Sequence, residues 1–168
     1  MLPLKKILWT TDFSDASKTS LRAAGEWALQ FKSLLYALNV VDPIPAVRPP
    51  VFSAMEPADT GFNIDAYRRE LEKASRESLK EIIDEELDKR VSAQPLVSYG
   101  NAPREIIRVA DEKGVDMIVI STHGRTGLKH LVFGSVAEQV VRNAHVPVLV
   151  IRSQKKEENE DVEKKEKE

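Results

Sequence analysis

The feature that most constrains the fold is a regular alternation of short apolar runs with segments of helical periodicity. The runs from Ile7 to Thr10 and from Leu34 to Val41 have the apolar character of buried strands. A strand, a helix and a strand of these lengths form a right-handed unit with parallel strands. Between the two runs, apolar residues recur at helical spacing, which predicts a helix that buries Leu21, Ala24, Ala28 and Phe31.

The same alternation continues in the second half of the chain, starting with a long charged segment. Residues 65–90 keep an apolar stripe among their charges, which predicts a long helix. We expect two ion pairs at i,i+4 spacing on its surface, Glu72–Arg76 and Glu85–Lys89. Its predicted inward face consists of Leu71, Leu79, Ile82, Ile83 and Leu87.

Three further strands are predicted, at Pro95–Ser98, Val115–Ile120 and Val146–Ile151. Proline near the start of the last one suits an edge strand. A helix lies between the first two, with Asn101 as its N-cap and Gly114 at its end. Another helix lies between the last two, with Ser135 in its first turn. The inward faces of these helices are predicted to hold Ile106, Ile107 and Ala110 in the first, and Val136, Ala137, Val140 and Val141 in the second.

Together these segments predict a doubly wound, Rossmann-like α/β fold: five mostly parallel strands with four helices on both faces of the sheet. In such a fold a ligand binds at the carboxyl ends of the strands, where the strand order reverses. A chain of 168 residues is long enough for one domain with a substantial core. We place this single domain at residues 1–152.

Two segments depart from the alternating pattern. Residues 42–64 hold five of the nine prolines and show little periodicity. Such a long connection is either mobile or functional, for example as a lid, and we expect a mobile insertion. Residues 153–168 hold five lysines, seven acidic residues and almost nothing apolar, so we expect a disordered charged tail.

Composition excludes several classes of function. The net charge of −2 does not favour binding to nucleic acid or to an anionic membrane. The absence of cysteine excludes disulfides, thiolate metal sites and a cysteine nucleophile, and it fits a reducing compartment. The sequence starts without the pattern of a signal peptide and has no apolar run of membrane-spanning length. We therefore expect a cytoplasmic protein.

A glycine-rich stretch between the last two predicted strands is the strongest candidate for a binding site. Ser121-Thr122-His123-Gly124-Arg125-Thr126-Gly127 follows a buried strand, and Gly134-Ser135 begins the next helix. Glycines allow backbone N–H groups to approach a ligand closely, and a helix N-terminus adds unpaired donors and partial positive charge. This combination favours an anion site, most plausibly for phosphate. A connection that needs glycine only for tight turns is equally compatible with the spacing.

Several familiar sites are absent from the sequence, including the P-loop, the G-x-G-x-x-G dinucleotide motif, the G-x-S-x-G elbow and H-E-x-x-H. Asp12 follows the first strand and could serve either as a helix N-cap or as a ligand-binding carboxylate. His123 lies within the glycine-rich loop, where both a structural and a chemical role remain open. His130 and His145 are assigned to surfaces or helix ends.

Several short motifs together resemble the universal stress protein family. Ser121-x-x-Gly124-x9-Gly134-Ser135 is similar to the G-x2-G-x9-G-[ST] signature of that family. The likeness extends in order over residues 5–152, through Lys6-Ile7-Leu8, Thr11-Asp12-Phe13-Ser14, Asn39-Val40-Val41-Asp42, Gly100-x-Ala102-Pro103 and Val146-Pro147-Val148-Leu149-Val150. It implies an adenine nucleotide alpha hydrolase-like sheet with strand order 3-2-1-4-5 and the switch point between strands one and four. It also implies a homodimer that pairs its last strands, Val146–Ile151, antiparallel.

In the ATP-binding branch of this family the glycine-rich loop holds the phosphates. Asp12 then stands at the ribose-binding carboxylate, with Thr11 beside it, and Val40 contacts adenine through its backbone. Ser121 stands where the family has glycine, and Thr10 stands where proline is common. The positions that the resemblance assigns to the phosphate loop, with their neighbours, are Ser121, His123, Gly124, Arg125, Gly127, Gly134 and Ser135.

We therefore expect a stress-response module that senses or carries ATP with Mg²⁺ or Mn²⁺, with the Ser135 hydroxyl as a candidate ligand of the metal. Two alternatives stay open: a slow Mg-dependent ATPase, and a dimeric interaction scaffold that binds no nucleotide. Hydrolysis requires a positioned water and neutralisation of charge. His123 is the only candidate general base in the loop, so the sequence favours binding over hydrolysis.

Overall fold

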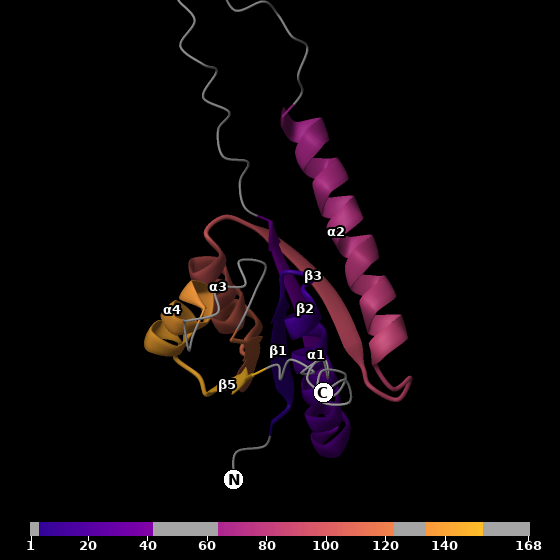
Figure 1. Ribbon diagram of the computed structural model, residues 1–168, viewed down its shortest axis with the longest axis vertical. Coiled ribbons are helices and arrows are strands. Elements are labelled where there is room, and N and C mark those ends of the chain that lie inside the picture. The colour runs from indigo at the N-terminus through magenta and orange to yellow at the C-terminus, as the bar shows by residue number, and fades with distance from the viewer. Residues whose placement is uncertain (1–3, 42–63, 123–133, 153–168) are drawn as a thin grey trace, which may run out of the picture.

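The computed structural model describes residues 4–41, 64–122 and 134–152 (Figure 1). Strands and helices alternate along the described chain. Their bounds are β1 Lys6–Thr11, α1 Asp15–Phe31, β2 Leu34–Val41, α2 Ile64–Glu86, β3 Ala93–Tyr99, α3 Ala102–Lys113, β4 Met117–Ser121, α4 Ser135–Asn143 and β5 Val148–Ile151. The predicted tail and all but one residue of the predicted mobile insertion lie outside the described residues.

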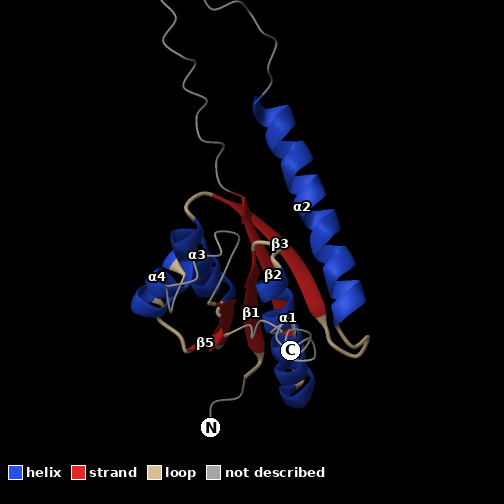
Figure 2. Cartoon of the chain, in the orientation of Figure 1, coloured by secondary structure: helices blue, strands red, loops and turns tan. Residues whose placement is uncertain are grey.

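The strands form one parallel sheet in the order β3-β2-β1-β4-β5, with helices on both of its faces (Figure 2). This confirms the predicted doubly wound fold and the strand order. The chain first winds from β1 outward to β3 and then crosses back to the other side of β1 to form β4 and β5. The direction of winding therefore reverses between β1 and β4.

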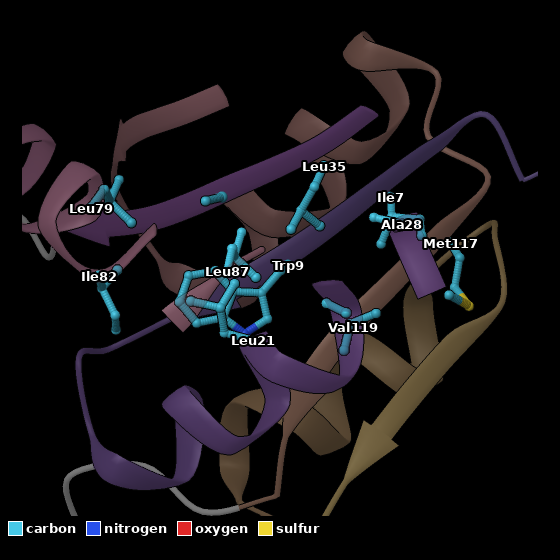
Figure 3. Packing of buried hydrophobic residues seen from close by; sticks show 12 residues of the cluster. Ile7, Trp9, Leu21, Ala28, Leu35, Leu79, Ile82, Leu87, Met117 and Val119 are labelled. Carbon is cyan, nitrogen blue, oxygen red and sulfur yellow. The ribbon is translucent and has the colours of Figure 1, made fainter. Parts of the chain in front are cut away.

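Two apolar layers hold the helices to the sheet, because successive strand residues point to opposite faces. Ile7 and Trp9 belong to the layer under α1 and α2, which Figure 3 shows, whereas Leu8 belongs to the layer under α3 and α4. All three side chains are fully buried. β1 is thus the central strand of both layers. None of the helices in the described ranges is long and apolar enough to cross a membrane.

The long charged helix is shorter than predicted. α2 ends at Glu86, so Leu87 is buried from the turn that follows the helix. The predicted Glu72–Arg76 ion pair is present at 2.8 Å. The predicted Glu85–Lys89 pair is wrong, because Lys89 lies beyond the helix and its Nζ contacts Asp84 at 3.0 Å.

Some predicted inward residues face solvent instead. Phe31 and Val141 are 37% and 45% exposed, because each lies at the margin of its helix face. In α3, Val109 is buried and Ile107 only partly so. The strand boundaries also differ from the prediction, since β4 and β5 each begin two residues later and β3 extends further at both ends.

Both predicted ends of α3 are confirmed. The Asn101 side chain accepts a hydrogen bond from the Arg104 amide, as an N-cap does. Gly114 ends the helix in the left-handed region, with φ of 59°.

Candidate functional site

The candidate site lies where β1 and β4 stop pairing. β1 pairs with β4 from Ile7 to Trp9, whereas its pairing with β2 continues to Thr11. Beyond Trp9 the carboxyl end of β1 is therefore paired on its β2 side. This point coincides with the reversal of strand order, where α/β sheets bind their ligands.

The Thr11 side chain shapes the turn that leads from β1 into α1. Thr11 Oγ1 accepts a hydrogen bond from the Phe13 amide at 2.8 Å and lies 2.8 Å from Ser17 Oγ. Ser17 Oγ donates its one proton to the Ser14 carbonyl at 2.6 Å, so the Thr11 hydroxyl is the donor to Ser17. The Thr11 hydroxyl is thus engaged within the fold, and its contribution to a site is to fix the turn.

Asp12 directly follows β1, and its carboxylate is held by the N-cap residue of α1. Its Oδ1 accepts bonds from the Ser14 amide at 3.1 Å and from the Ser14 hydroxyl at 2.6 Å. The sequence left two roles open for Asp12; the structure assigns the N-cap of α1 to Ser14. Asp12 is half-buried rather than enclosed, so the position suits a carboxylate that meets a ligand.

Phe13 has an unusual backbone conformation. Its φ of 64° lies in the left-handed region, which costs a residue with a side chain about 1–3 kcal/mol. The hydrogen bond from its amide to Thr11 supports this conformation, and its ring packs against the layer under α1 and α2. Backbone strain of this kind concentrates at functional sites.

The opposite side of the candidate site is formed by the end of β4 and the start of α4. The Gly134 amide donates to the Thr122 carbonyl at 2.7 Å, and the Thr122 amide donates to Ile151 at 3.0 Å. These bonds hold the N-terminus of α4 at the end of β4. Ser135, the first residue of α4, is exposed. The first amides of a helix have no partner within it and carry partial positive charge, so this end can receive an anion.

Gly134 is required by packing rather than by its backbone angles. Its φ of −68° and ψ of 149° are open to any residue. A Cβ at this position, however, would lie 2.6 Å from the Thr122 carbonyl oxygen. The glycine therefore permits the close approach of α4 to β4.

Among the described residues, the site residues that the sequence predicts lie at the end of the sheet formed by the carboxyl ends of its strands. Thr11 and Asp12 follow β1, Val40 lies near the end of β2, and Ser121 ends β4. His123, Gly124, Arg125 and Gly127 lie outside the described residues. Within the described ranges, no group of three or more His, Asp or Glu side chains could hold a metal ion by itself.

Sequence reasoning missed Asn39. This residue of β2 is 7% exposed, and its Nδ2 donates to the Thr11 carbonyl at 2.8 Å. Its Oδ1 accepts from Ser75 Oγ of α2, also at 2.8 Å. A signal was available, because Asn39 is the one polar amide in the apolar run from Leu34 to Val41.

This chain matches a known protein family over most of its length. The model of the universal stress protein family matches residues 3–152. This chain belongs to that family. Among its relatives, universal stress protein MJ0531 of Methanocaldococcus jannaschii is 36% identical over 155 residues, covering 91% of this chain and 85% of the relative.

Solved structures of other universal stress proteins share the fold. The structure of MJ0577, also from Methanocaldococcus jannaschii, aligns with a TM-score of 0.71 and 27% identity, covering 91% of this chain and 99% of that one. A universal stress protein from Archaeoglobus fulgidus in complex with dAMP aligns with a TM-score of 0.57. It is 21% identical and covers 89% of this chain and 99% of that one, so its likeness shows the fold.

Proposed function

We propose that this universal stress protein binds ATP, with Mg²⁺ or Mn²⁺, at the carboxyl ends of β1 and β4. The observation that carries the proposal is the bond between the Gly134 amide and the Thr122 carbonyl. It holds the N-terminus of α4, which carries partial positive charge, at the same end of the sheet as the Asp12 carboxylate. A nucleotide needs this pairing of features, a donor-rich end for its phosphates and an acceptor for its ribose hydroxyls.

Each part of the nucleotide has a proposed partner. The triphosphate lies against the start of α4 and the glycine-rich loop, with Ser121 and Gly134 at its borders. Asp12 accepts hydrogen bonds from the ribose, and the backbone of Val40 contacts the adenine. The Ser135 hydroxyl faces the metal of Mg-ATP. The Archaeoglobus fulgidus complex supports an adenine nucleotide as the ligand class, since dAMP is bound by a protein of this fold.

Binding, rather than hydrolysis, is the activity that we propose. A phosphoryl-transfer enzyme must orient a water and neutralise the charge of its transition state. Ser135 and Arg125 are candidates for charge stabilisation, but His123 remains the single candidate base. A protein that senses or carries ATP needs the binding site but needs no catalytic base.

Isothermal calorimetry with Mg-ATP tests the proposal. The parent should bind with a Kd between about 1 μM and 1 mM, the range of about −8 to −4 kcal/mol. Asp12→Ala should weaken binding at least about tenfold, since a hydrogen bond to a charged group contributes about 1.5–3 kcal/mol. Asp84→Ala is the matched control, because it removes an exposed carboxylate of α2. A parent that shows no heat of binding, in the presence of either metal, would refute the proposal.

We further propose a homodimer through β5. Within the described residues β5 is an edge strand, paired with β4 alone, and all four of its residues are only partly buried. The carbonyls of Pro147 and Ile151 bond to β4, so the backbone groups of Val148 and Val150 point to the open edge. An apolar edge strand of this kind is protected by pairing with a second copy across a two-fold axis.

A further inference from the structure

A buried side-chain amide ties the turn after β1 to the middle of α2. The Asn39 Nδ2 donates to the Thr11 carbonyl, and the Asn39 Oδ1 accepts from the Ser75 hydroxyl. Ser75 is the first buried residue of α2 among residues 65–86. Its neighbours on the same face of β2, Leu35 and Ala37, are apolar and fully buried. A polar group in such a layer costs about 1–3 kcal/mol unless it is hydrogen-bonded. Both the Nδ2 and the Oδ1 of Asn39 are hydrogen-bonded, so the cost of burying this amide is offset.

The Asn39 contact adds to the strand pairing that orients the peptide before Asp12. β1 and β2 pair as far as Thr11 and Asn39, and in this parallel pairing the Val40 amide also faces the Thr11 carbonyl. The Thr11 carbonyl and the Asp12 amide belong to one planar trans peptide, so they point in opposite directions. The Thr11 carbonyl points toward β2, where Asn39 donates to it, so the Asp12 amide points toward the side of β4. Pairing with β4 has already ended at Trp9, so this side faces the candidate site.

We propose that Asn39 is a positioning residue for ribose recognition, acting through the Thr11–Asp12 peptide. The inference rests on the proposed function, in which Asp12 accepts hydrogen bonds from the ribose. Thr11 Oγ1 and Ser14 hold the side-chain end of the turn. The Asn39 bond holds the carbonyl of the peptide that carries Asp12. Without this bond the last peptide of β1 is held by strand pairing alone, and the Asp12 carboxylate is aligned less firmly with the ribose hydroxyls.

The phosphate side of the site should not depend on Asn39. The start of α4 is held by Thr122, which in turn is anchored to Ile151 of β5. β5 lies three strands away from β2 in the sheet. Loss of the Asn39 bond should therefore affect ribose recognition selectively, and this selectivity separates positioning from a general loss of stability.

The test compares Mg-ATP with Mg-2′,3′-dideoxy-ATP by calorimetry on the full chain. The parent should prefer ATP by about tenfold, because the dideoxy nucleotide lacks the hydroxyls that Asp12 accepts. In Asn39→Leu, which keeps the side-chain volume and removes the amide, the preference should fall below about threefold. The affinity for the dideoxy nucleotide should change by less than about threefold. Asn39→Ser, which is smaller and cannot span the distance to Thr11, is the second variant if the leucine variant does not fold.

Ser75→Ala is the matched control. It removes the α2 partner of Asn39 but leaves the bond to Thr11, so the preference for ATP should stay within about twofold of the parent. An Asn39→Leu protein that weakens both nucleotides by the same factor, and so keeps the preference, overturns the inference alone. The same conclusion follows if Ser75→Ala abolishes the preference as fully as Asn39→Leu. A parent that binds neither nucleotide refutes the proposed function, and this inference with it.

Discussion

Replacing Gly134 by alanine tests whether close packing at the start of α4 is what the glycine provides. The added Cβ would lie 2.6 Å from the Thr122 carbonyl oxygen, whereas real Cβ contacts are essentially never below 3.0 Å. The two backbones must therefore separate by at least about 0.4 Å, the difference of these two distances. Neither group can rotate away, because the clash is with a main-chain atom.

The free-energy cost follows from three contributions. Forcing extra volume into a packed site costs about 1–3 kcal/mol. The Gly134–Thr122 hydrogen bond, now 2.7 Å, lengthens and loses part of a contribution of about 0.5–1.5 kcal/mol. Alanine restricts the unfolded chain more than glycine does, which offsets about 0.4–1 kcal/mol of this destabilisation. We expect a net loss of about 1–2 kcal/mol in the free energy of unfolding.

Urea unfolding measures this loss as a midpoint lower by about 0.5–1 M, for a slope near 2 kcal/mol/M. Gly25→Ala is the matched control: its Cβ would meet the tip of the Leu87 side chain, which can adjust, and alanine favours the helix. We expect that variant to stay within about 1 kcal/mol of the parent. A Gly134→Ala protein as stable as the parent would show that the carbonyl clash is not the reason for glycine here.

Three further predictions address the site, the sheet edge and an ion pair. Ser121→Gly should change the calorimetric affinity for Mg-ATP by less than about tenfold, because Ser121 ends a strand without a positive φ, so its backbone does not require glycine. Val150→Pro should give a monomer by light scattering, since it removes an N–H that points to the open edge, and a retained dimer would contradict pairing through β5. Arg108 and Ser98 lower the pKa of Glu105 below its ordinary value of 4.5. The stabilising contribution of the ionised Glu105 is therefore complete above pH 4.5, and it is lost as the pH falls through the lowered pKa. Urea unfolding of Glu105→Gln should accordingly show a smaller loss of stability below pH 4.5 than the parent shows.

The fold could be predicted because apolar periodicity is a property of the sequence itself. The β2 run from Leu34 to Val41 was located to the residue, since each neighbour in a parallel sheet demands an apolar strand. The end of α2 was placed too late, because the charged residues 88–90 continue the composition of the helix without continuing its structure. Phe31 and Val141 were assigned inward for a related reason: spacing identifies a face but not the width that the sheet covers.

The candidate site was less accessible to sequence reasoning. The glycine-rich motif identified Gly134, but the reason for that glycine is a contact with Thr122 that spacing does not encode. The turn after β1 is shaped by hydroxyls of α1, and the partners of a serine in a helix depend on which face meets the sheet. Asn39 could have been noticed as a polar residue in an apolar strand, yet its partner Ser75 lies 36 positions away.

The polar contacts around the candidate site anchor its two sides to different parts of the fold. On the β1 side, Trp9 Nε1 donates to Ser20 Oγ at 2.8 Å, and Ser20 donates to the Ser17 carbonyl at 2.8 Å. Ser17 then meets Thr11, so a buried chain of hydroxyls connects the core to the turn that carries Asp12. On the β4 side, the start of α4 is anchored through Thr122 to β5. A ligand that contacts both sides therefore joins two separately supported surfaces at the point where β1 and β4 no longer pair. A nucleotide is suited to this arrangement, because its ribose and its phosphates present different chemistry at opposite ends of one molecule.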